Sequence, residues 1–147
     1  MTAYLQKMKG NILTHNHPFN EQREQFGIEQ NSAFSPADIR TAYNNGITEV
    51  RMIIGNQTHS FSWNSDTSAY RARDFVNMVE SETARANRRI QTATTRAQNQ
   101  INRGANVNST IRTMYQNQNR AINDLNSIFE SESHQSLFGF AYRKGRT

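Results

Sequence analysis

Residues 12–18 read Ile-Leu-Thr-His-Asn-His-Pro, and a polar stretch separates them from Phe-Ser-Pro-Ala-Asp at residues 34–38. His15 and His17 lie at the end of a short apolar run, which predicts a strand. In a strand, residues i and i+2 point to the same side, roughly 7 Å apart. Two imidazoles so placed can converge on one metal ion, with Asp38 as a third ligand. Two histidines, one aspartate and an open fourth position have the form of a catalytic zinc site.

Asp38 also has a purely structural role open to it. Ser35 suits the N-cap of a helix, Pro36 suits its first position, and Asp38 at N3 completes a variant of the capping box. The residues that follow predict a helix to about Asn44, ended by an Asn-Gly pair. Capping and metal ligation are therefore both open for Asp38.

The motif His-x-His-Pro, followed by Ser-x-x-Asp at a helix start, resembles the JAB/MPN metallopeptidase-type core, also called JAMM, and most closely its RadC-like branch. The matching positions are His15, His17, Pro18, Ser35 and Asp38. The resemblance continues through a helix, a turn and a returning strand, and covers residues 10–65. It implies zinc as the cofactor, held by the two histidines and the aspartate, and Ser35 as a group that steadies an oxyanion.

Two features depart from that family. Residues 19–34 separate the second histidine from Ser35, where the family has a short gap. The family also carries its catalytic glutamate on a strand upstream of the histidines, but residues 1–14 contain no acidic residue. The chain looks like a JAB core truncated at its N-terminus, so we assign no catalytic residue and favour a non-enzymatic function. Three carboxylates of the insert could replace the missing glutamate: Glu21, Glu24 and Glu29.

The hydrophobic pattern predicts an α+β fold. Apolar residues alternate up to Trp63 and then recur about every 3.5–3.6 residues. We predict a domain boundary between a JAB-like lobe at 1–65 and an arginine-rich helical extension at 66–147. The predicted elements are a sheet from residues 10–15, 48–55 and 58–64, a packed helix at 36–44, and a long helical hairpin at 67–103 and 109–131.

The helical half contains one plausible break and ends in an ambiguous tail. Glycine, asparagine and serine cluster at residues 104–109 and each disfavours a helix interior by about 0.5–1 kcal/mol. This favours a hairpin over one continuous helix, with Ser109 as the second N-cap. Residues 137–142 are rich in aromatic side chains and are followed by basic ones. They form either a last edge strand or a basic aromatic tail.

The helical half is also strongly basic. Residues 83–123 contain no acidic residue and seven arginines: Arg85, Arg88, Arg89, Arg96, Arg103, Arg112 and Arg120. Four of them follow one another at steps of four, seven and seven, which keeps them on one broad helix face. Arginine suits bidentate contact with phosphate. We predict that this face binds nucleic acid or a nucleic-acid-binding protein complex; the alternative is a solvated surface.

Composition sets further limits. The 147-residue chain has 35% hydrophobic residues, a mean hydropathy of −0.86 and no cysteine, which excludes disulfides and thiolate ligands. No apolar run approaches the ~18 residues of a membrane span, and the N-terminus lacks a signal-peptide segment. We therefore expect no membrane partner and a cytoplasmic protein, in the host cell if it is phage-encoded.

Three functions are open. Segments of this form are similar to ones found in phage head-morphogenesis and other mobile-element proteins. By that analogy, the chain would be a phage-encoded inhibitor of a host nucleic-acid-associated defence complex, such as an anti-CRISPR. The first alternative is a JAMM-type zinc-dependent hydrolase of peptide or isopeptide bonds. The second is a phage structural or assembly protein, with a thin heptad seam that supports a homodimer.

Overall fold

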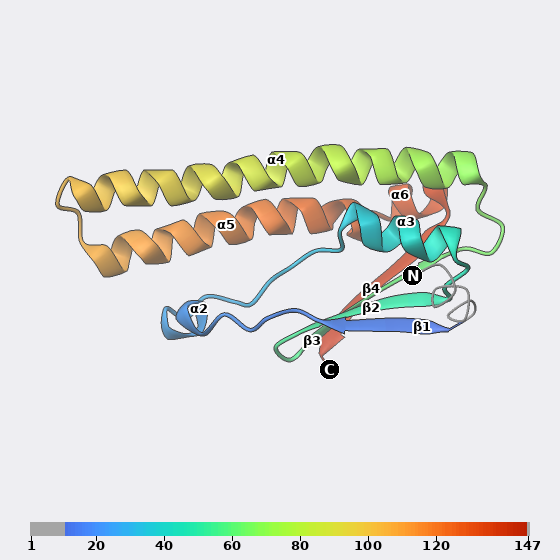
Figure 1. Cartoon of the computed structure of the whole chain (residues 1–147), viewed down its shortest axis with the longest axis horizontal. Helices are drawn as coiled ribbons and strands as arrows, with labels where there is room; N and C mark the ends of the chain where they lie inside the picture. Colours follow the sequence, from blue (N-terminus) through green and yellow to red (C-terminus); the bar gives the residue numbers. More distant parts are fainter. Residues whose placement is uncertain (1–10, 147) are drawn as a thin grey trace.

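The computed structural model describes residues 11–146 and shows a four-stranded sheet beneath a long helical hairpin (Figure 1). The strands follow the order β1-β2-β3-β4. They are β1 (Ile12–Asn16), β2 (Glu49–Ile54), β3 (Gln57–Trp63) and β4 (Phe140–Arg146). β1 runs parallel to β2, and the other pairs are antiparallel. The predicted α+β fold is confirmed; residues 1–10 of the first predicted domain lie outside the described residues.

Helix α3 (Pro36–Asn44) forms at the predicted residues and lies between β1 and β2 in the chain. It begins at the Ser35 N-cap and buries Ile39 and Ala42. The predicted β2–β3 hairpin also forms, and its turn contains Gly55 with a φ of 58°. This strand–helix–strand arrangement sets the first turn of α3 beside the inner face of β1.

The helical hairpin is formed by α4 (Ala69–Asn102) and α5 (Val107–Glu130). Gly104, with a φ of 93°, lies in the turn, so the hairpin is confirmed over a continuous helix. The prediction that Ser109 caps the second helix is wrong. Asn106 is the N-cap, and its Oδ1 accepts a hydrogen bond from the Ser109 amide at 2.9 Å. Asparagine is an equally good cap, and the N-cap lies three residues earlier than predicted.

Small apolar side chains are buried where α4 and α5 pack together. They include Ala86, Ala93 and Ala97 on α4, and Ala121 and Leu125 on α5. Alanine allows two helix backbones to approach closely. Ala97 and Leu125 belong to the predicted heptad seam, so this part of the seam is buried within a single chain, and the homodimer stays a prediction.

The sequence patterns missed the short helix α6 (Glu132–Phe138). Ser131 ends α5 and caps α6, and the left-handed residue Gly139, with a φ of 81°, ends it. The Gly139 carbonyl accepts hydrogen bonds from the Thr67 hydroxyl at 2.6 Å and the Asn64 amide at 2.8 Å. These bonds direct the chain into β4, so of the two predictions for the tail, the edge strand is the one that forms.

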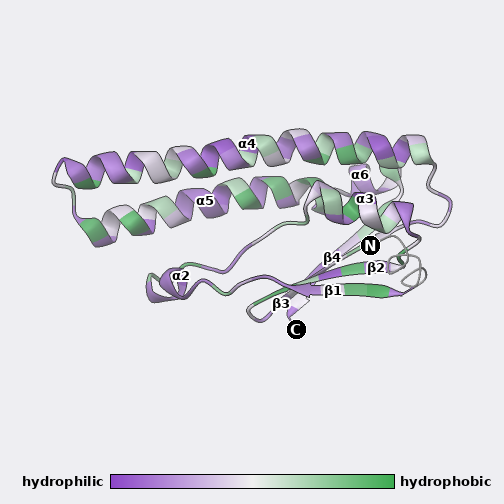
Figure 2. Cartoon of the chain, in the orientation of Figure 1, coloured by the Kyte–Doolittle hydropathy of each residue, from purple (hydrophilic) through white to green (hydrophobic). Residues whose placement is uncertain are grey.

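One aromatic core joins the sheet to the hairpin. Phe75 of α4 stacks on Phe140 of β4 with ring centroids 4.3 Å apart and meets Phe129 of α5 edge-on at 5.5 Å. Phe61 of β3 is fully buried against the same cluster. Figure 2 shows that β1 and β2 carry hydrophobic residues, whereas the half of α4 that leads into the hairpin turn is largely hydrophilic. The core therefore draws on both sides of the boundary expected at residue 65.

The insert at residues 19–34 is joined to α5 by hydrogen bonds. Its short helix α2 (Glu21–Gln25) lies below the far half of the hairpin (Figure 1). Arg23 Nη2 donates to Gln118 Oε1 at 3.1 Å, and Asn126 Nδ2 donates to the Ser32 carbonyl at 2.8 Å. Across residues 11–146, no helix combines the length and apolar character needed to cross a membrane.

Candidate functional site

The predicted metal ligands come from the inner side of β1 and the first turn of α3. Leu13 and His15 are half-buried on β1, whereas Thr14 between them is exposed. His15 is in register with Met52 of β2, which pairs in turn with His59 of β3. The sheet thus sets two histidines in one row, on either side of a buried methionine.

The structure places His15 near each of the other two predicted ligands. His15 Nε2 lies 3.9 Å from Asp38 Oδ2, and the ring centroids of His15 and His17 are 5.0 Å apart. The His15 Nε2 atom is buried and has no hydrogen-bond partner in the described part of the chain. An imidazole nitrogen that makes no hydrogen bond is free to act as a metal ligand.

His17 is turned toward the insert. Its Nδ1 lies 2.9 Å from the Ser32 hydroxyl. Burial lowers the pKa of His17, the neighbouring His15 lowers it further, and Asp38 opposes both effects. His17 therefore favours the neutral form that a metal ion requires, but Ser32 already occupies one of its two ring nitrogens.

Asp38 and Ser35 form the predicted capping box. The Asp38 amide donates to Ser35 Oγ at 3.1 Å, and the Ser35 amide donates to Asp38 Oδ2 at 3.1 Å. Asp38 Oδ2 is also the oxygen nearest to His15, and a carboxylate oxygen can accept a second bond. Ser35 Oγ therefore caps the N-terminus of α3 in this structure.

These donors fit a zinc ion only in part. Zinc bonds of about 2.0–2.2 Å in a tetrahedral site place neighbouring donors about 3.3 Å apart. The His15–Asp38 separation of 3.9 Å is longer. Within residues 11–146, no three side chains of the ligating types are arranged to hold one ion. Zinc therefore stays a prediction.

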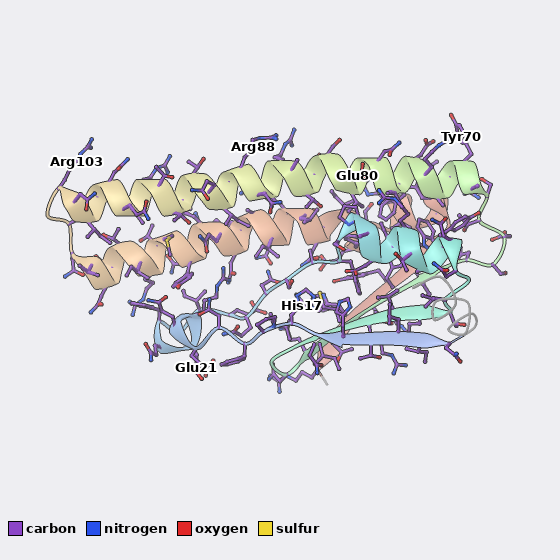
Figure 3. The ribbon with its side chains drawn as sticks, in the orientation of Figure 1. His17, Glu21, Tyr70, Glu80, Arg88 and Arg103 are labelled. Carbon is purple, nitrogen blue, oxygen red and sulfur yellow. The ribbon has the colours of Figure 1, made fainter. Side chains whose placement is uncertain are left out.

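The three carboxylates of the insert form no ion pair with His15 or His17 in the described part of the chain. Glu21 and Glu24 lie in the first turn of α2, and Figure 3 shows Glu21 apart from His17. Glu29 Oε1 accepts a hydrogen bond from Gln57 Nε2 at 2.8 Å. In the described structure, none of the three takes the position of a general base.

The sequence patterns did not reveal the polar pair that His59 of β3 forms with Tyr142 of β4. His59 is fully buried, and its Nδ1 lies 2.6 Å from the hydroxyl of Tyr142 on β4. Burial raises the pKa of the Tyr142 hydroxyl, as does the nearby Glu130. Only the addition of β4 to the sheet brings this pair together, so no local signal could have revealed it.

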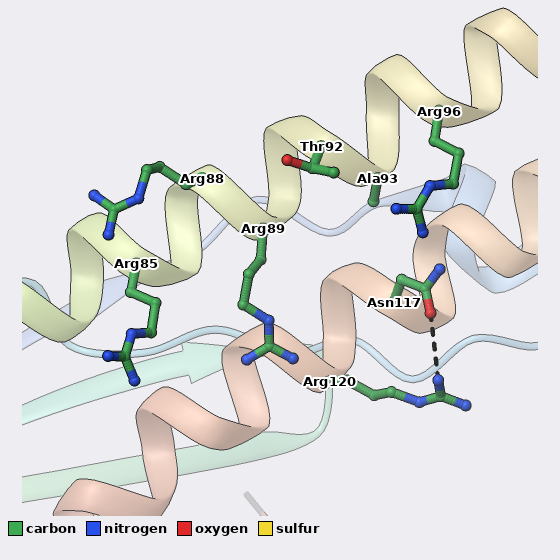
Figure 4. A pocket seen from close by; sticks show the side chains of 8 residues that line it. All are labelled: Arg85, Arg88, Arg89, Thr92, Ala93, Arg96, Asn117 and Arg120. Atoms are coloured by element: carbon green, nitrogen blue, oxygen red, sulfur yellow. Dashed lines mark hydrogen bonds between the residues drawn. The ribbon is translucent and has the colours of Figure 1, made fainter.

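A second candidate site is a groove of about 400 Å³ on the helical hairpin (Figure 4). We call it the arginine groove. Its lining residues are Arg85, Arg88, Arg89, Thr92, Ala93, Arg96, Asn117 and Arg120. Figure 4 shows Arg85, Arg89 and Arg96 extending from α4 toward α5. The hairpin thus gathers five of the seven predicted arginines around one depression.

A second groove, of about 550 Å³, adjoins the first toward the hairpin turn. It shares Thr92 and Arg96 with the arginine groove and ends at Arg103. Figure 3 shows Arg88 and Arg103 projecting from α4 away from the sheet. The remaining predicted arginine, Arg112, is exposed on α5 and lines neither groove.

Two carboxylates that lie just outside residues 83–123 form ion pairs with arginines of that segment. Arg89 Nη1 lies 2.6 Å from Asp124 Oδ2, and Arg85 Nη1 lies 3.8 Å from Glu82 Oε2. The i,i+3 spacing could have revealed the second pair, whereas the first requires the hairpin. Four arginines of the two grooves have no carboxylate partner within residues 11–146: Arg88, Arg96, Arg103 and Arg120.

Comparison of the chain with known protein families, with curated proteins and with solved structures finds no match. The resemblance to a JAB/MPN core therefore stays a prediction, and the geometry of the two sites is the basis for inferring function.

Proposed function

We propose that this chain is a non-catalytic binding protein whose arginine groove holds the phosphate backbone of a nucleic acid. The observation that carries the proposal is that five arginines line one groove, with only two carboxylates paired to them. Cations held together repel one another, and an anionic ligand relieves that repulsion. Arginine contacts to phosphate supply affinity without reading sequence.

A triple substitution tests the proposal. Replacing Arg88, Arg96 and Arg120 with glutamine removes three unpaired charges and leaves both ion pairs of the groove intact. If each contacts one phosphate, binding to mixed-sequence DNA should weaken by about two orders of magnitude at about 0.15 M salt, and by more at lower salt. Fluorescence anisotropy measures the binding, and urea unfolding checks that the fold persists.

A matched control removes the same charge outside the groove, by glutamine at Arg73, Arg112 and Arg146. Under the proposal, the control variant binds much more tightly than the groove variant at both low and physiological salt. Equal binding by the two variants, or undiminished binding by the groove variant, would contradict the proposal.

The more specific function is inhibition of a host nucleic-acid-associated defence complex, of the anti-CRISPR kind, by a phage-encoded protein. What supports it is the sequence resemblance together with the basic groove. A protein channel that normally holds nucleic acid is itself basic, so the groove suits the nucleic acid of such a complex better than its empty channel. Inhibition of target binding by a purified complex, lost in the groove variant, tests this function.

A zinc-dependent hydrolase is the second candidate function. The observation in its favour is the buried, unpartnered His15 Nε2 at 3.9 Å from Asp38 Oδ2. Metal analysis of protein purified without a histidine tag tests it, with His15→Ala as the control. About one zinc per chain in the parent and none in the variant would support a metal site. Absence of bound zinc in both would remove the hydrolase.

A further inference from the structure

We infer that the arginine groove selects duplex nucleic acid over single strands, and that Asp124 limits its affinity by competing for Arg89. This inference rests on the proposed function and deepens it, because it names the form of the ligand and a built-in restraint on the same site.

The first step is the absence of aromatic rings from both grooves. Residues 76–114, which cover most of α4, the turn and the start of α5, contain no aromatic residue and no histidine. The linings of both grooves consist of arginine, threonine, alanine, asparagine and glutamine. Proteins that hold single strands gain about 1–3 kcal/mol per base by stacking on aromatic rings. These grooves offer a single strand no such gain.

The second step is the spacing of the arginines along α4. The two grooves adjoin at Thr92 and Arg96, so the cationic track on α4 runs from Arg85 to Arg103. At about 1.5 Å per residue it is about 27 Å long and straight. A duplex is stiff on this scale and carries one charge per about 1.7 Å of its axis. A straight line of cations carried on one helix therefore suits a duplex backbone better than a flexible strand.

Counterion release sets the size of the expected preference for duplex over single strand. Each phosphate contact adds to the slope of the logarithm of the association constant against the logarithm of salt concentration, by about 0.9 for duplex DNA and about 0.7 for a single strand. With contacts from Arg88, Arg96, Arg103 and Arg120, the four arginines without a carboxylate partner, the slopes are about 3.6 and about 2.8. At about 0.15 M salt this difference favours the duplex by about fourfold.

The third step concerns Asp124. Its carboxylate lies 2.6 Å from Arg89 Nη1, and its side chain is 69% exposed on α5. A phosphate that approaches Arg89 must displace this carboxylate or share the guanidinium with it. Asp124→Asn therefore frees one cation of the groove without disturbing the core. One additional phosphate contact should tighten duplex binding roughly fivefold at about 0.15 M salt and steepen the salt slope by about 0.9.

The experiment measures anisotropy with a duplex of about 20 base pairs and a single strand of the same length, over a range of salt. The parent protein and Asp124→Asn are compared with Asp66→Asn, a change before α4 and outside both grooves. We expect the parent to bind the duplex more tightly than the single strand. Of the two variants, only Asp124→Asn should bind the duplex more tightly than the parent, and with a steeper dependence on salt.

Equal or tighter binding of the single strand would overturn the duplex preference and leave the proposed function standing. Unchanged duplex binding by Asp124→Asn would overturn the competition at Arg89. No binding of either probe would instead refute the proposed function.

Discussion

His59 should make the stability of this protein depend on pH, and its replacement by asparagine tests the cause. The side chain is fully buried, and its Nδ1 lies 2.6 Å from the Tyr142 hydroxyl. Its Nε2 has no partner within residues 11–146. Burial lowers the pKa of His59 to about 4; Lys144 and His17 act in the same direction, and Glu29 opposes them.

The magnitude follows from the two pKa values of this one group. In the unfolded chain, His59 has the ordinary pKa of 6.5. As the pH falls below that value, the unfolded state binds a proton that the folded state does not accept until about pH 4. The contribution to stability is therefore fully present above pH 6.5 and is lost between pH 6.5 and about 4. The loss is roughly 3 kcal/mol, a large fraction of the stability of a small domain.

Urea unfolding at about pH 7.5 and about pH 4 measures this loss. His59→Asn keeps an amide near the position of Nδ1 but does not titrate, so the parent should lose roughly 3 kcal/mol more than this variant on acidification. Tyr142→Phe is the matched control. It removes the hydrogen bond, at a cost of about 1 kcal/mol, but keeps the titrating imidazole and should keep the acid loss. An acid loss in His59→Asn as large as in the parent would refute the reasoning.

Three further substitutions test the packing and capping. Phe75→Ala should lower the free energy of unfolding by about 3–5 kcal/mol, because Phe75 is fully buried at the centre of the aromatic core. The control is Tyr70→Ala, at a side chain that is 65% exposed, which should change the free energy of unfolding by less than about 0.5 kcal/mol. Ser35→Ala should cost about 1 kcal/mol through loss of the α3 cap, measured by urea unfolding. Gly139→Ala should cost more than about 2 kcal/mol, because the residue has a φ of 81° and the new Cβ would lie 2.3 Å from Thr67 Oγ1; an unchanged midpoint would contradict this geometry.

Local pattern was sufficient for β2 and for the start of α3. Val50, Met52 and Ile54 alternate along β2, and all three are buried as their spacing predicts. The capping box at Ser35 is likewise readable from four consecutive residues. Helix α6 escaped prediction because it is only seven residues long and exposes Leu137, so it has no apolar stripe to reveal it.

The contacts that shape both candidate sites depend on the tertiary fold. His59 and Tyr142 lie 83 positions apart, and Arg89 and Asp124 lie 35 apart. The arginine face was predictable because helical spacing alone gathers its members on one side of α4. The carboxylate that restrains Arg89 was not, because it depends on how α4 and α5 are aligned.

The most direct test of the arginine groove compares two single substitutions on the hairpin. Arg96 lines both grooves and Arg112 lines neither, and replacement by glutamine removes one positive charge in each case. The measurement is the slope of the logarithm of the DNA association constant against the logarithm of salt concentration. We expect Arg96→Gln to reduce the slope by about 0.9 and Arg112→Gln to leave it at the parent value. Equal slopes for the two variants would show that nucleic acid does not bind in the groove.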